Sequence, residues 1–155
     1  MYKILVEGSL LPKENQQAVE RIEYELTTLI RRAVYLDISD KKIGHLERVV
    51  YLLLRHLDEF GPSRLKELAE TFNLDISTLS RQASAIEAKG YIMRFSDPAD
   101  GRVSLFKLTE LGREKLITDK KMRIERYHDM LEAWSDEEKK IFGELLVRMN
   151  EALID

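Results

Sequence analysis

Apolar residues recur every three or four positions along most of this chain, which is the spacing of amphipathic helices. Residues 14–36 carry one such stripe, and residues 46–60 carry a second that ends before Gly61 and Pro62. Both stripes predict scaffold helices. Their apolar positions are Val19, Ile22, Leu26, Leu29, Ile30, Ala33 and Leu36, followed by Leu46, Val49, Val50, Leu53, Leu54 and Leu57.

Two shorter helices are predicted next, at the spacing of a helix-turn-helix. The first covers residues 64–72 and has its apolar residues on one face, and the turn follows at residues 73–74. Asp75 is a good N-cap for the second helix, because its carboxylate can accept from free backbone N–H groups. That helix runs to about Lys89 and ends at Gly90, the usual residue just past a helix end.

The second short helix has two different faces when successive residues are placed 100° apart. The inner face is predicted to be core and consists of Ile76, Leu79, Ala83 and Ile86. The outer face is small and polar around one arginine and consists of Ser77, Thr78, Arg81, Ser84, Ala85 and Ala88. Such a face suits entry into the major groove of DNA, where an arginine can bind guanine. The alternative interpretation is a solvated helix face.

A β-hairpin is predicted after this helix. Residues 91–95 and 103–108 are rich in β-forming side chains, and the turn residues 97–101 separate them. Arg102 stands at the tip, where the Asp100 carboxylate can brace its guanidinium. An arginine placed there can enter the minor groove. The alternative is an exposed turn charge with a weak local ion pair.

The last third of the chain predicts two more helices. Thr109 is a plausible N-cap for a helix extending to about Trp134, and Ser135 with Glu138 has the form of a capping box. The final helix has one broad apolar face that must be covered by another surface. Its residues are Ile141, Phe142, Leu145, Leu146, Met149, Ala152 and Leu153.

The order of these elements resembles the winged-helix core of the MarR (multiple antibiotic resistance regulator) family. The resemblance is carried by the helix-turn-helix, then by Asp100, Arg102, Phe106, Leu108 and Thr109, and by Leu111 and Gly112. It implies a mainly α fold with a small β-hairpin wing. In that fold a winged helix-turn-helix core is flanked by N- and C-terminal dimerisation helices.

The resemblance also implies domain boundaries and partners. One domain over residues 14–153 would contain the helix-turn-helix motif (64–87), the wing (91–108) and dimerisation helices (14–36 and 110–153). A two-fold dimer would place two recognition helices about 34 Å apart, which matches a palindromic operator in double-stranded DNA.

Composition narrows the class of protein. The 155 residues include no cysteine, which excludes disulfides, thiolate zinc sites and cysteine redox sensing. No apolar run is long enough for a membrane span and no signal peptide is evident, so no membrane role and a cytoplasmic location are expected. The net charge is -3, but residues 61–113 hold a slight excess of Lys and Arg. Local cations, with Arg64 and Lys66 at phosphates, are therefore expected to attract DNA.

Candidate chemistry other than DNA binding is sparse. None of the three histidines has a second histidine three or four residues away, and there is no nucleophile elbow or phosphate loop, so neither a metal site, a cofactor nor an enzyme is expected. The resemblance implies an effector site near residues 36–51. There His45, Arg48 and Tyr51 could bind a small aromatic or phenolic effector, or could have purely structural roles.

The sequence thus predicts a sequence-specific DNA-binding transcriptional regulator, a homodimeric repressor released by a small-molecule effector. Its DNA-contacting residues are expected to be Arg64, Lys66, Ser77, Thr78, Arg81, Ser84, Asp100 and Arg102. The alternative is a winged-helix protein-interaction module without DNA binding, which the acidic overall charge would suit.

Overall fold

The computed structural model describes residues 13–38 and 43–153, which fall into two compact units divided after residue 42. The first unit contains one long helix, α1 (Lys13–Ile38). This helix confirms the first predicted stripe. The second unit holds all the other elements and is described by itself below.

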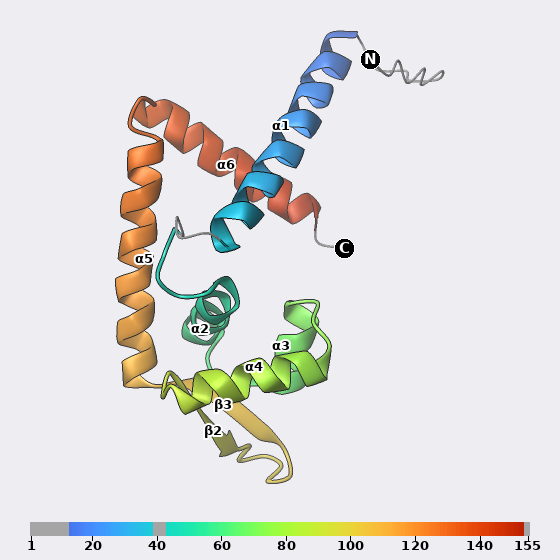
Figure 1. Ribbon diagram of the computed structural model, residues 1–155. Helices are drawn as coiled ribbons and strands as arrows, with labels where there is room; N and C mark the ends of the chain where they lie inside the picture. Colours follow the sequence, from blue (N-terminus) through green and yellow to red (C-terminus); the bar gives the residue numbers. More distant parts are fainter. Residues whose placement is uncertain (1–12, 39–42, 154–155) are drawn as a thin grey trace. The chain divides into compact units, whose positions relative to one another are not determined.

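The second unit is a winged helix-turn-helix followed by two helices (Figure 1). Most of it is α-helical, as the sequence predicted, and it has three short strands, of which two form the predicted hairpin. Its elements in chain order are α2 (Arg48–Phe60), β1 (Ser63–Arg64), α3 (Leu65–Thr71), α4 (Ile76–Ala88), β2 (Ile92–Ser96), β3 (Ser104–Leu108), α5 (Glu110–Met130) and α6 (Asp136–Ala152).

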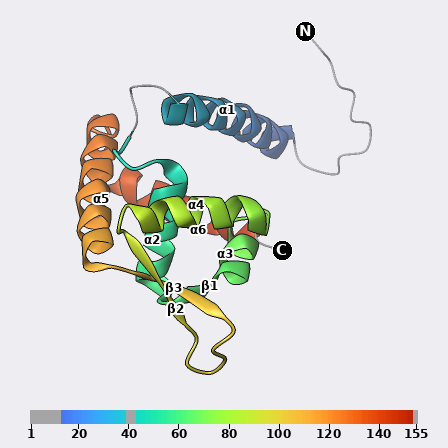
Figure 2. The ribbon, with the colours of Figure 1, turned by 60° about the horizontal axis from the view of Figure 1, so that its bottom comes forward.

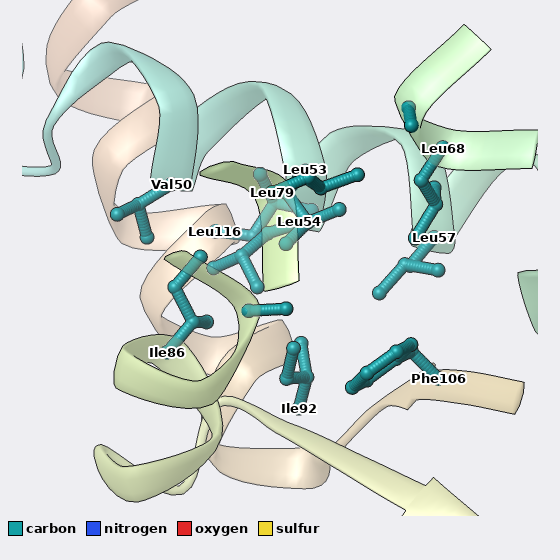
Figure 3. Packing of buried hydrophobic residues seen from close by; sticks show 12 residues of the cluster. Val50, Leu53, Leu54, Leu57, Leu68, Leu79, Ile86, Ile92, Phe106 and Leu116 are labelled. Atoms are coloured by element: carbon teal, nitrogen blue, oxygen red, sulfur yellow. The ribbon is translucent and has the colours of Figure 1, made fainter. Parts of the chain in front are cut away.

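One hydrophobic core joins α2, α3, α4, the sheet and the start of α5 (Figure 3). Leu53 and Leu54 of α2 are fully buried, as are Leu68 of α3 and Leu79 of α4. Ile92 and Phe106 bring the two wing strands into the same cluster, and Leu116 brings α5. Burying each such side chain is worth about 1.5–3 kcal/mol, so this core fixes where α4 and the wing stand.

The sheet has the order β1-β3-β2 and is antiparallel throughout. In the hairpin Ile92 pairs with Leu108 and Ser96 with Ser104, which confirms the predicted wing. β1 was not predicted from sequence. It is only two residues long and is defined by pairing of Ser63 with Phe106, more than forty positions away.

Local capping sets the ends of the helices as predicted. The Asp75 carboxylate accepts from the Thr78 backbone N–H at 2.8 Å. Gly90 has φ 78°, the left-handed conformation that suits glycine. The Thr109 hydroxyl accepts from the Gly112 N–H at 3.0 Å and donates to the Gly90 carbonyl at 2.5 Å. Thr109 thereby joins the end of α4 to the start of α5.

Two details of the sequence interpretation were wrong. Ile76 was expected in the core but is 52% exposed, because it is the first residue of α4 and lines a shallow hollow that separates the start of this helix from α3. The helix expected to reach Trp134 ends at Met130, and a turn over residues 131–134 precedes the Ser135 cap. The capping box of Ser135 and Glu138 is present as predicted, with hydrogen bonds of 2.7 and 3.2 Å.

Candidate nucleic-acid interface

The outer face of α4 is open to solvent along its length. Ser77, Arg81 and Ser84 are exposed, and Thr78 is half-buried. The side chain of Arg81 has one hydrogen bond within the same helix, at 3.5 Å from its guanidinium to the Thr78 hydroxyl. The predicted division of α4 into a packed face and a small polar face is therefore present, with Ile76 as the exception.

Asp75 organises the first turn of α4. Its carboxylate accepts from the Ser77 hydroxyl and from both the backbone N–H and the hydroxyl of Thr78. These bonds, the one from Ser77 first, hold the pKa of Asp75 well below its usual value, so the group stays ionised. The first turn of the helix thus carries a fixed negative charge beside two oriented hydroxyls.

The wing projects beyond the rest of the winged domain, as both ribbon views show (Figures 1 and 2). At its tip the Asp100 carboxylate accepts from the Arg102 backbone N–H at 3.1 Å and from its Nε at 3.3 Å. The Arg102 side chain is nevertheless 93% exposed. The predicted brace between Asp100 and Arg102 is therefore present. The Asp100 carboxylate holds the Nε of Arg102, while most of the arginine side chain stays exposed to solvent.

Arg64 lies on β1 and is tied to the base of the wing. Its guanidinium is 2.7 Å from Asp97, a buried carboxylate that also accepts from the Ala99 N–H at 2.9 Å. The hydrogen bond from Ala99 and then the one from Arg64 lower the pKa of Asp97 below its usual value. About half of the Arg64 side chain remains exposed. It can therefore still face a phosphate, although part of its charge is neutralised.

Lys66 lies at the rim of a shallow hollow between α3 and the start of α4. The hollow has a volume of about 350 Å³ and is also lined by Ile76. The ammonium is 3.9 Å from Glu70, and both side chains are mostly exposed. An exposed pair of this kind is weak, so Lys66 can rearrange toward an anion.

The residues expected to bind an effector lie near the start of α2. His45 and Arg48 are exposed, whereas Tyr51 is half-buried and has the Arg123 guanidinium 4.0 Å from its ring centre. Arg123 also pairs with Asp119 at 2.6 Å, and Asp119 accepts from the His45 backbone N–H. Sequence reasoning missed this cluster, because Asp119 reads as part of the charged run Asp119-Lys120-Lys121.

The described residues contain neither a metal-binding cluster nor a membrane-spanning helix. Within residues 13–38 and 43–153 no group of three or more His, Asp or Glu side chains is placed to hold a metal ion. In the same part of the chain no helix is long and apolar enough to cross a membrane.

Comparisons with known proteins agree with this arrangement. The model of the MarR family matches residues 46–104. A Bacillus subtilis (strain 168) protein, described as the uncharacterized HTH-type transcriptional regulator YxaD, is 68% identical over 142 residues, which are 92% of this chain and 99% of that protein.

Solved structures show the same fold. A MarR family protein from Bacillus stearothermophilus has a TM-score of 0.71 at 20% identity, covering 94% of this chain and 99% of its own. FabT from Streptococcus pneumoniae, solved in complex with DNA, has a TM-score of 0.64 at 21% identity, covering 87% and 96%.

Proposed function

This chain belongs to the MarR family of transcriptional regulators, with a DNA-binding winged helix, and from that premise we propose that it is a homodimeric repressor of a palindromic operator. Membership of the MarR family confirms that the protein is a transcriptional regulator rather than an enzyme. It also argues against the alternative of a winged-helix protein-interaction module without DNA binding. A regulator of this kind works beside the chromosome, so a cytoplasmic location belongs to the proposal.

The observation that carries the proposal is the pairing of an open helix face with an open wing tip. α4 presents Ser77, Thr78, Arg81 and Ser84 on the surface that does not pack into the core. The hairpin that follows it presents Arg102 beyond the domain. A helix in the major groove with an arginine in the adjacent minor groove would use both features.

Electrostatics adds the remaining contacts. Arg64 and Lys66 lie on β1 and the first turn of α3, ahead of the recognition helix, and are proposed to bind phosphates. Asp100 acts on DNA through Arg102, whose Nε it holds at 3.3 Å. These roles are tested by fluorescence anisotropy with a duplex from just upstream of the coding region. Alanine variants of Arg64 and Lys66 should weaken binding to native and scrambled duplexes alike, because phosphates carry no sequence.

The dimer is supported by an uncovered apolar face on α6. None of the residues of this helix is buried within the described chain. Phe142 packs against Trp134 at 5.3 Å between ring centres, and around them lies a second shallow hollow lined also by Ile141 and Leu145. Exposed apolar surface of this extent is typical of a protein interface. We place dimerisation at residues 14–36 and 110–153.

Light scattering coupled to size-exclusion chromatography tests the dimer. The expected mass is that of two chains. Leu145 is 51% exposed on the apolar face of α6, so Leu145→Glu places a charge on that face and should shift the mass toward that of one chain. Glu144→Gln, at the neighbouring exposed position, is the matched control and should stay dimeric. A wild-type protein that remains a single chain at micromolar concentration would contradict this part of the proposal.

Release by an effector rests on the residues at the start of α2. The exposed His45 and Arg48 can offer donors to a carboxylate or phenol, and Tyr51 follows Arg48 by three residues on α2. The probes are benzoate and phenol, measured by thermal shift and by loss of operator binding. Near-complete switching of a two-state regulator needs about 5.5 kcal/mol of differential affinity. An Arg48→Ala variant that responds like the wild type would exclude this site.

Repression is tested in cells. A reporter placed behind the upstream region should rise in expression when the regulator is deleted, and return to its basal level when the wild-type protein is supplied. A fall on deletion would identify an activator instead.

A further inference from the structure

Ile76 is an exposed apolar side chain at the N-terminal end of α4. It is the first residue of the helix and is 52% exposed, whereas Leu79, one turn further on, is fully buried. In helix-turn-helix proteins the N-terminal residues of the second helix contact base edges. The apolar group that the major groove offers there is the C5-methyl of thymine.

The two hydroxyls beside Ile76 have a fixed polarity. A hydroxyl has a single proton to donate, and those of Ser77 and Thr78 are both directed to the Asp75 carboxylate. What these oxygens still offer is lone pairs, although the Thr78 oxygen also accepts a long hydrogen bond from the Arg81 guanidinium at 3.5 Å. Their complement on DNA is therefore a hydrogen-bond donor, and the ionised Asp75 next to them disfavours a phosphate.

We propose that the first turn of α4 reads an A·T base pair, with Ile76 against the thymine methyl and the oxygens of Ser77 and Thr78 accepting from the adenine N6 amino group. Of the base pairs, A·T and T·A alone present both an amino donor and a methyl in the major groove. A G·C pair also offers an amino group, on cytosine, but has hydrogen where thymine has its methyl. This inference rests on the DNA-binding function proposed above and names what that function selects.

The methyl contact is tested on a duplex recovered by in vitro selection from a randomised library with the full-length protein. Each thymine is replaced in turn by uracil, which lacks only the C5-methyl. A replacement in one half-site should weaken binding about fourfold, and the same replacement in both half-sites should weaken it about 15-fold. The Ile76→Ala variant should bind the uracil duplex almost as tightly as the thymine duplex. The Ile76→Val variant should lose affinity by a factor between those of Ile76→Ala and wild type. Met93→Ala, which truncates an exposed apolar residue on β2, is the control that should keep the full loss.

The amino contact is tested at the adenine that pairs with the sensitive thymine. Replacing it by purine removes the N6 amino group and should weaken wild-type binding about fivefold. The variant Ser77→Ala with Thr78→Val should show no further loss from the same replacement, and circular dichroism verifies that its α4 remains folded.

The selection and the uracil replacements distinguish a wrong base contact from a lack of sequence-specific DNA binding. A selected duplex that tolerates uracil at every position, or that loses as much with Ile76→Ala as with wild type, would overturn this inference and leave DNA binding intact. A selection that returns no preferred duplex would overturn the proposed function itself, and the inference with it.

Discussion

The carboxylate of Asp119, in the middle of α5, accepts from the backbone N–H of His45 at 2.6 Å across 74 positions of sequence. It accepts from the Leu46 N–H as well, at 2.9 Å, and it pairs with Arg123, which in turn donates to the Leu46 carbonyl at 3.1 Å. Asp119 is 2% exposed. The segment that leads into α2 is therefore held to α5 by the buried ion pair of Asp119 and Arg123.

Asp119→Asn should destabilise the protein strongly. The change leaves the Arg123 charge without its partner in a site where water has little access, and breaking a buried pair in this way costs about 3 kcal/mol. Glu125→Gln is the matched control, because Glu125 pairs with Lys121 on the same helix at 4.0 Å in an exposed position. Urea unfolding measures both. Equal midpoints for the two variants would contradict the buried role of Asp119.

Gly112→Ala should prevent normal packing of the wing on α5. A Cβ at this position would overlap the backbone carbonyl of Tyr91, which cannot move away as a flexible side chain could. The loss should be at least about 3 kcal/mol, the upper range for overpacking. Gly101→Ala in the turn of the wing is the control, since a Cβ there meets no atom of the described chain. Thermal melting should separate the two variants clearly, and a Gly112→Ala protein as stable as wild type would disprove the close approach.

Arg81→Ala should weaken operator binding by about 1–3 kcal/mol and relax preference at one base position, if the guanidinium reads a base. Arg102→Ala should weaken binding with little change in base preference, because the minor groove distinguishes base pairs poorly. Competition binding against single-base operator variants tests the contrast. Identical preference profiles for wild type and Arg81→Ala would remove Arg81 from base readout.

The Asp75 cap makes part of the stability pH-dependent. Its pKa is lowered on folding from 3.8 in the unfolded chain, so its contribution is present above pH 3.8 and declines as pH falls toward the folded value. Asp75→Ala should therefore lower the melting temperature by a few degrees near pH 7, with a smaller difference from wild type below about pH 3. A difference that does not change with pH would point to packing rather than to the ionised cap.

Local features of this fold could be predicted from sequence. Asp75, Thr109 and Ser135 each cap a helix by bonding to residues two or three positions away, so the chemistry is visible in a short window. Helix and hairpin positions follow from periodicity for the same reason. The small polar face of α4 and the Asp100 brace of Arg102 belong to this group.

Long-range features could not be read in this way. β1 exists because Phe106 pairs with Ser63, and Asp119 is buried because two backbone N–H groups from another segment meet it. In both cases the partner is a backbone group of a distant segment, and the residue types in that segment do not reveal the contact. Ile76 was misassigned because periodicity gives the angle around a helix but not whether a neighbouring element covers that position.

The salt dependence of operator binding tests whether this protein is a sequence-specific DNA-binding regulator. Fluorescence anisotropy is measured for wild-type protein with the upstream duplex and with a scrambled duplex at several salt concentrations. Phosphate contacts from Arg64 and Lys66 in each of two subunits predict a slope of log affinity against log salt of about −3.6, with tighter binding to the upstream duplex. A slope near zero, or equally weak binding to both duplexes at low salt, would contradict a sequence-specific regulator acting at its own upstream region.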